Sequence, residues 1–314
     1  MSARGQAAWR ARNRVPLATL GVVLAAFCWG LSAIIAKGAF DRGITPEQMA
    51  QARVAVAAVP LLLFLGTFRR ELIVPSRRAL PMLVAFGAAM VVVNWSYYVA
   101  IDRLDVGVAI SLQYTAPVLI LVLAAVWSRR SPGGVAWGAG LLTLVGAVLV
   151  SGAYAGLASL DGIGLLAGIG AAFSFAAYLL TAEGAGRRGA HPATVLLIGF
   201  AVATIIWGVL QPWWSWPFGS LADPQVSVRV LAVGLFGTLL PFMLAVSAVR
   251  IISASLAGIA ATFEPVFAAG LAWVLLGQQL SPPQLIGGAC VVAGVVIAQL
   301  ARTAPSATPV EITP

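Results

Sequence analysis

The chain has 314 residues, of which 61% are hydrophobic and only 9% are charged. Soluble domains carry about 45–50% apolar and about 25% charged residues, so this composition excludes an ordinary soluble protein. The formal net charge of +9 does not indicate a nucleic-acid-binding protein, because the arginines lie in short gaps between apolar runs and not on one polar or aromatic face.

Apolar segments recur along the whole chain, and each approaches the roughly 20 residues that a helix needs to cross a bilayer. Taken in order, they cover residues 17–37, 49–68, 80–101, 106–127, 135–152, 162–181, 192–213, 228–249, 254–276 and 283–301. Prolines such as Pro192 and Pro283 stand at segment starts, where a missing N–H costs a helix little. The pattern predicts an all-α integral membrane protein with ten transmembrane helices.

The basic residues are distributed unevenly between the two sides that ten alternating spans would create. Cytoplasmic loops of membrane proteins are enriched in Lys and Arg. One side carries Arg4, Arg10, Arg12, Arg14, Arg69, Arg70, Arg77, Arg78, Arg129, Arg130, Arg187, Arg188, Arg250 and Arg302, whereas the other carries Lys37, Arg42, Arg103 and Arg229. We therefore predict a multi-pass protein of the cell (inner) membrane with both termini in the cytoplasm.

Four tryptophans gather where the seventh helix is expected to leave the membrane on the outer side. They are Trp207, Trp213, Trp214 and Trp216. Tryptophan is enriched at membrane–water interfaces, so we expect an interfacial anchor. A gate or a solute contact is the alternative.

An internal repeat appears when the chain is shifted against itself by 148 residues, which brings Pro117 onto Pro265. The glycine pairs Gly140/Gly288 and Gly146/Gly294 then also coincide. Because five helices is an odd number, the second half enters the membrane from the opposite side, as in the inverted repeats of secondary transporters. We predict a cytoplasmic segment over residues 1–16, five-helix halves over residues 17–152 and 162–301, and a disordered cytoplasmic tail over residues 302–314.

The two halves resemble the EamA repeats of the drug/metabolite transporter superfamily over about residues 16–302. The most specific stretch lies in "AVRIISASLAGIAATFEPVFAAGLAWVLLGQQLSPPQLIGGACVVAGVVIAQL", and the first half echoes it in "AISLQYTAPVLILVLAAV" and "GAGLLTLVGAVLVSG". The chain departs from the family where Gln278 or Gln279 replaces the turn acid, where Ser128 and Arg129 stand at the corresponding turn of the first half, and where Ala116 stands opposite Glu264. The resemblance implies efflux of amino acids and other small metabolites without ATP.

Two charged residues lie at membrane depth, where a charge costs about 2.5–3.5 kcal/mol on insertion scales and needs a partner or a role. Glu264 precedes Pro265, and Arg53 lies within the second apolar segment. Glu264 is either a proton-linked switch or a structural group that binds a helix end or pairs with Arg53. Arg53 either takes part in this coupling or extends its long side chain outward to the interface. Pro117 and Pro265 are expected to kink their helices.

Polar and aromatic residues inside the spans mark the expected solute pathway. Residues spaced by three or four positions share one helix face, and such faces point inward because lipid satisfies no polar group. The candidates are Trp29, Ser32, Asn94, Tyr97, Tyr98, Gln113, Tyr114, Ser174 and Tyr178. The alternative for each is a contact that only holds neighbouring helices together. Gly164 and Gly168 are expected to allow a close helix contact.

Other classes of membrane protein fit the sequence less well. An enzyme needs convergent carboxylates, histidines or a metal, whereas this chain has a single histidine, His191, in an expected cytoplasmic loop. A channel or receptor stays open as the alternative function. We expect no catalytic residues, no metal, no cofactor and no nucleic-acid partner. A monomer is expected to be sufficient in the lipid bilayer, although a homodimer stays open.

Overall fold

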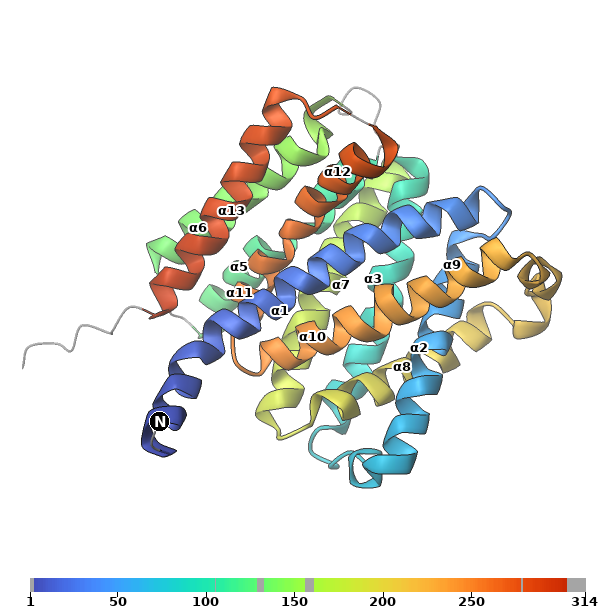
Figure 1. Cartoon of the computed structure of the whole chain (residues 1–314), viewed down its shortest axis with the longest axis horizontal. Helices are drawn as coiled ribbons and strands as arrows, with labels where there is room; N and C mark the ends of the chain where they lie inside the picture. Colours follow the sequence, from blue (N-terminus) through green and yellow to red (C-terminus); the bar gives the residue numbers. More distant parts are fainter. Residues whose placement is uncertain (1–2, 105, 129–132, 156–160, 278, 304–314) are drawn as a thin grey trace, which may run out of the picture.

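The computed structural model describes residues 3–104, 106–128, 133–155, 161–277 and 279–303, and no strand occurs among them (Figure 1). Its longer elements are α1 (Ala3–Phe40), α2 (Pro46–Phe68), α3 (Leu80–Arg103), α4 (Val106–Gln113), α5 (Ala116–Ser128), α6 (Gly134–Ser151), α7 (Gly162–Arg187), α8 (Pro192–Leu210), α9 (Pro224–Gly234), α10 (Leu240–Val249), α11 (Ala254–Ala261), α12 (Phe263–Leu276) and α13 (Pro282–Thr303). Short helical turns form η1 (Arg70–Leu72), η2 (Ala153–Ala155), η3 (Trp213–Ser215), η4 (Phe218–Ala222) and η5 (Leu235–Leu239), and η5 is a π-helix. The predicted all-α fold is confirmed.

The bundle has the surface of a protein that lies in lipid. Nine helical stretches in the described part of the chain are long and apolar enough to cross a membrane, and Pro282–Ala298 is a shorter apolar helix. Large apolar side chains such as Phe64, Leu166 and Ile205 are exposed on the outside of the bundle. Lipid tails are as apolar as these side chains, so such exposure costs little in a bilayer. The multi-pass architecture is confirmed, and the tenth span stays a prediction.

The fourth and ninth spans, predicted as continuous helices, are each broken in the middle. The fourth divides into α4 and α5 after Gln113, and the ninth divides into α11 and α12 after Ala261. A proline ring clashes with the carbonyl four residues earlier and donates no backbone hydrogen bond. Pro117 lies four residues after Gln113, and Pro265 lies four residues after Ala261. The prolines predicted to kink these helices therefore lie directly behind the two breaks, at matching positions of the repeat.

Helix packing follows the 148-residue repeat. Helix α3 of the first half packs along α7 of the second half. The repeat relates α3 to α9 and α10, and it relates α7 to α1. Helices α9 and α10 correspondingly pack along α1. Helices α6 and α13, which end the two halves, lie side by side at the edge of the molecule (Figure 1). In each of these pairs, a helix of one half packs against a helix of the other half. Two similar halves produce this arrangement when a twofold-like axis relates them.

Glycines bring α6 and α13 into close contact. A Cβ atom added to Gly146 would lie 2.7 Å from the carbonyl oxygen of Gly287 and 2.8 Å from the backbone nitrogen of Val291. A Cβ atom on Gly294 would lie 3.0 Å from the carbonyl oxygen of Ala139. Small residues allow such backbone contact between membrane helices. The repeated glycines Gly146 and Gly294 thus hold the two halves together at equivalent places.

Several helices begin or end away from the boundaries of the predicted segments. Helix α1 extends to Ala3 and Phe40, beyond the expected residues 17–37, and α7 continues to Arg187, where an ion pair with Glu183 supports its last turn. Helix α8 ends at Leu210, because the following residues turn into η3. Helix α13 includes residues 302 and 303 of the expected tail, whereas residues 304–314, Arg129, Arg130 and Gln278 lie outside the described residues.

The four tryptophans do not form one interfacial anchor. Trp214 is 86% exposed, but Trp207 and Trp216 are buried within the bundle at 3% and 6% exposure. Trp216 packs into a cluster that includes Val226 and Val230 of α9. The indole rings therefore fill the space between helix ends, and only Trp214 stands free as an anchor would.

Substitution of Gly146 by Ala tests the contact between the two halves. We expect Gly146→Ala to lower the melting temperature in detergent, because overpacking a tight contact costs about 1–3 kcal/mol. Gly138→Ala on the same helix is the control, since a Cβ atom there meets nothing within 4 Å. Equal melting temperatures for the two variants would contradict the proposed packing.

Candidate functional site

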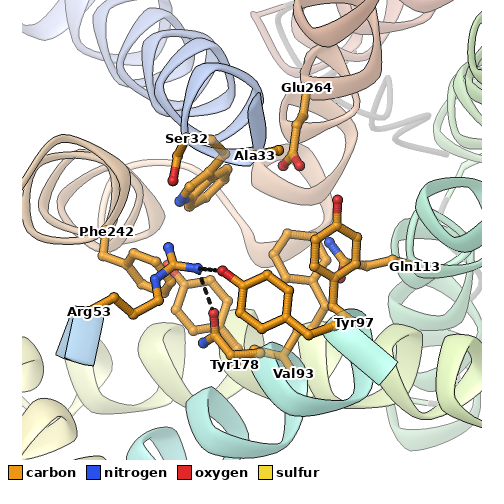
Figure 2. A pocket seen from close by; sticks show the side chains of 13 residues that line it. Ser32, Ala33, Arg53, Val93, Tyr97, Gln113, Tyr178, Phe242 and Glu264 are labelled. Atoms are coloured by element: carbon orange, nitrogen blue, oxygen red, sulfur yellow. Dashed lines mark hydrogen bonds between the residues drawn. The ribbon is translucent and has the colours of Figure 1, made fainter. Parts of the chain in front are cut away.

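A cavity lined mainly by buried side chains lies between the two halves of the chain. It is lined by Trp29, Ser32, Ala33, Arg53, Val93, Asn94, Tyr97, Tyr98, Gln113, Phe175, Tyr178, Phe242 and Glu264. Its free volume of about 70 Å³ has room for a few water molecules. Arg53 and Glu264 reach it from different sides, with aromatic rings between them (Figure 2). A larger solute would need the surrounding helices to move apart.

Arg53 on α2 extends into the bundle and is held by neutral groups of two other elements. Its Nη1 donates to Asn94 Oδ1 at 2.9 Å and to the Tyr98 hydroxyl at 3.1 Å, both on α3. Its Nε donates to Thr238 Oγ1 at 2.7 Å, and its Nη2 donates to the Gly237 carbonyl at 2.5 Å, both in η5. The side chain is buried and does not extend outward to the interface, so that alternative is wrong.

The π-helical turn η5, which connects α9 to α10, presents two acceptors to the Arg53 guanidinium. Thr238 Oγ1 also donates to the carbonyl of Val233, five residues earlier, at 2.9 Å. Gly237 lies so close to α1 that an added Cβ would overlap Ser32 Oγ at 2.1 Å. π-Helical turns are rare and occur frequently at functional sites. Here the wider turn directs Gly237 and Thr238 toward Arg53.

Glu264 reaches the cavity from the first turn of α12, next to the break in the ninth span. Its carboxylate oxygen Oε2 accepts a hydrogen bond from the Tyr114 hydroxyl at 2.7 Å. Tyr114 lies at the corresponding break of the fourth span, between α4 and α5. The two broken helices are therefore joined by one buried hydrogen bond. No ion pair between Glu264 and Arg53 occurs among the described residues.

Four polar atoms of the cavity-lining side chains are buried with no hydrogen-bond partner in the described part of the chain. They are Trp29 Nε1, the Tyr97 hydroxyl, Gln113 Oε1 and the Tyr178 hydroxyl. A buried polar group without a partner costs about 1–3 kcal/mol, and folded proteins rarely leave several together. The set supplies donors and an acceptor, so it is suited to a polar solute.

Aromatic rings form the walls between these polar groups. Trp29 and Phe242 meet edge to face at 5.5 Å between ring centroids, and Phe175 stacks on Tyr178 at 5.8 Å. The Arg53 guanidinium lies 5.9 Å from the centre of the Phe242 ring. Such walls accept apolar parts of a solute, while the polar atoms orient it.

The structure brings most of the predicted pathway residues together. Trp29, Ser32, Asn94, Tyr97, Tyr98, Gln113 and Tyr178 line the cavity. Tyr114 lies behind this lining and contacts it through Glu264. Ser174 is not among the lining residues, and its hydroxyl donates to the carbonyls of Gly170 and Ala171 on its own helix.

The apolar and backbone parts of the site were not predicted from the sequence. Phe175 and Phe242 line the cavity, and Gly237 and Thr238 hold Arg53. Phe and Gly are common inside membrane helices, so composition marks none of them. Phe175 follows the candidate Ser174 by one residue, and helical spacing to Tyr178 was the available signal. No cluster of three His, Cys, Asp or Glu side chains that could hold a metal occurs within the described residues.

A multi-pass helical bundle with a polar cavity between broken helices is the architecture of a secondary transporter. The chain belongs to the EamA-like transporter family, which it matches over residues 16–152 and 162–299. The predicted family is thus confirmed, and with it a membrane protein that carries out transport.

Characterised and uncharacterised transporters are similar over almost the whole chain. The threonine/homoserine exporter RhtA of Escherichia coli K12 is 28% identical over 285 residues, which cover 89% of each chain. RhtA of Salmonella typhimurium LT2 is 26% identical over the same coverage. The uncharacterized transporter YwfM of Bacillus subtilis is 25% identical over 89% of this chain and 92% of its own. One crystal structure shares the fold, with a TM-score of 0.72 at 20% identity over 90% of this chain and 96% of its own.

The hydrogen bond from Arg53 to Thr238 can be tested with an isosteric change. We expect Thr238→Val to lower the melting temperature in detergent. The Nε–H group of the buried Arg53 side chain loses its acceptor, and an unsatisfied buried donor costs about 1–3 kcal/mol. Thr204→Val is the control, since the Thr204 hydroxyl is buried with no partner among the described residues. The network assignment fails if the two variants melt alike.

Proposed function

We propose that this protein exports small polar metabolites, amino acids among them, across the cell membrane. The observation that carries the proposal is a buried cavity with two charges and four unpartnered polar atoms, placed between the two halves of a transporter-family fold. Similarity to threonine/homoserine exporters supports both the direction of transport and the solute class. The aromatic walls also suit amphiphilic solutes. Nothing comparable favours a channel, a receptor or an enzyme.

We propose ten spans arranged as two inverted halves, with both termini in the cytoplasm. The matching breaks at Gln113 and Ala261 and the exchanged helix partners support this topology. The arginines gathered on one predicted side support the orientation. Tags on the two chain ends must then be reached from the same side of the membrane. One bundle encloses its own cavity, so a monomer is sufficient.

The transport mechanism that we propose is alternating access around the cavity. A site of this kind opens to one face and then to the other when one half rocks against its partner. The glycines of α6 and α13 form a close interface between the two halves. The small free volume is consistent with a site that must widen before a solute enters.

Efflux in cells tests the proposed function directly. Cells that produce the protein are loaded with amino acids and with amphiphilic metabolites, and retained solute is compared with that of cells lacking the protein. We expect faster loss of at least one solute from the producing cells. Asn94→Leu is the variant control, because it removes a cavity-lining amide that holds Arg53. Equal retention of every solute in both strains would remove the basis for an exporter.

We further propose that Glu264 couples transport to a proton. It is a buried carboxyl that borders the cavity, where Tyr114 donates to it and where the other titratable or charged lining groups are Arg53, Tyr97, Tyr98 and Tyr178. A carboxyl in such a place can exchange a proton with the solute pathway as the two faces open in turn. Gradient coupling fits a chain in which no ATP-binding motif occurs.

Replacement of Glu264 by Gln tests this coupling. We expect the flux of wild-type protein in liposomes to vary with pH, and the flux of Glu264→Gln to be lower and independent of pH, because an amide binds no proton in this range. Glu47→Gln, in the first turn of α2, removes a carboxyl outside the cavity and is expected to keep the wild-type profile. A Glu264→Gln protein with an unchanged pH profile would refute the role.

A further inference from the structure

We propose that Arg53 and Glu264 form two separate subsites that bind the carboxylate and the ammonium group of one zwitterionic solute. This inference rests on the proposed function and assigns the specificity of the same cavity. It predicts that both charges of an α-amino acid are recognised, each by a group of opposite sign. It also predicts that neither charged side chain serves the other as its permanent partner.

The first argument is that neither side chain forms an ion pair in the described part of the chain. Arg53 and Glu264 are 7% and 6% exposed, and both line the cavity. Every hydrogen-bond partner of the two side chains in the described residues is neutral: Thr238, Asn94, Tyr98 and Gly237 for Arg53, and Tyr114 for Glu264. Buried charges are normally paired, and leaving one unpaired is strongly unfavourable. A zwitterion brings the two missing counter-charges in one molecule.

The second argument is the binding capacity that remains on each side. A guanidinium has five N–H donors, and the bonds of Arg53 occupy four of them. Its planar fork fits a carboxylate, which can replace the weaker neutral acceptors Asn94 and Tyr98. On the other side, only Oε2 of Glu264 accepts a hydrogen bond from the described side chains, so Oε1 is left for an ammonium donor.

The third argument is that the two charged side chains reach the cavity from different sides and that unpartnered polar atoms also line it. Figure 2 shows Arg53 and Glu264 on different sides of the cavity, with Tyr97 and Gln113 toward the side of Glu264. Tyr97, Gln113, Tyr178 and Trp29 each contribute one buried atom without a partner. These atoms can bind a polar side chain once the two charges of the solute are in place. The cavity can therefore accept a polar side chain in addition to the two charged groups.

Three probes separate the two subsites: L-threonine, its methyl ester, which lacks the carboxylate charge, and β-hydroxybutyrate, which lacks the ammonium group. Each is measured as a competitor of labelled L-threonine exchange in liposomes with wild-type protein, Arg53→Gln and Glu264→Gln. Loss of one charge-assisted hydrogen bond corresponds to roughly tenfold or more in affinity. We expect wild-type protein to bind threonine at least about tenfold more tightly than either analogue.

The variants give opposite patterns if the assignment is correct. Arg53→Gln should lose about tenfold for threonine and β-hydroxybutyrate, and keep its affinity for the methyl ester. Glu264→Gln should lose about tenfold for threonine and the methyl ester, and keep its affinity for β-hydroxybutyrate. Uniform losses for all three probes would show that the charges are structural and would overturn the proposal.

The remaining measurements distinguish failure of the zwitterion assignment from failure of the exporter function. If Arg53→Gln does not fold, Arg53→Lys retains the charge and should keep discrimination against the methyl ester, while the wild-type and Glu264→Gln comparisons still decide the case. If the wild-type protein exports a solute in the efflux experiment but binds neither threonine nor any other zwitterionic amino acid, this inference is wrong and the exporter function stands. If no solute is exported, the proposed function fails first.

Discussion

The structure depends on one buried guanidinium. Arg53 of α2 binds α3 through Asn94 and Tyr98, and it binds the π-helical turn of the eighth span through Gly237 and Thr238. A charge at this depth is expensive, so the groups that surround it are constrained in type and position. The close approach of Gly237 to Ser32 adds α1 to the same constraint. First-half and second-half elements are thus held around one side chain at the edge of the cavity.

The second constraint comes from the prolines that follow the two helix breaks. By ending α4 and α11 in the middle of the bundle, they place Tyr114 within one break and Glu264 in the first helical turn after the other. Irregular backbone at membrane depth is tolerated where protein buries it or where it lines a cavity. The hydrogen bond from Tyr114 to Glu264 links a residue of the first half to a residue of the second half beside the two breaks.

Much of this arrangement could be anticipated from residue type and spacing. The recurrence of apolar segments predicted a multi-pass helical protein, and the duplicated prolines and glycines predicted equivalent structure in both halves. The cost of polar groups in lipid directed Asn94, Tyr97, Gln113 and Tyr178 inward, and they do line one cavity. The Ser174 hydroxyl is also satisfied away from lipid, because it donates hydrogen bonds to backbone carbonyls of its own helix.

The sequence by itself determined that the chain is a helical membrane protein with two related halves. Hydrophobicity marks each apolar helix from its own residues, and prolines and glycines recur at the same spacing in both halves. Only the tertiary structure decided what each charge contacts. Arg53 finds Thr238 some 185 positions away in sequence, and Tyr114 finds Glu264 across 150 positions. The π-helical turn likewise leaves no compositional mark, because it arises from packing against α1 and α2. Contacts of such separation depend on how whole helices pack, which no local pattern encodes.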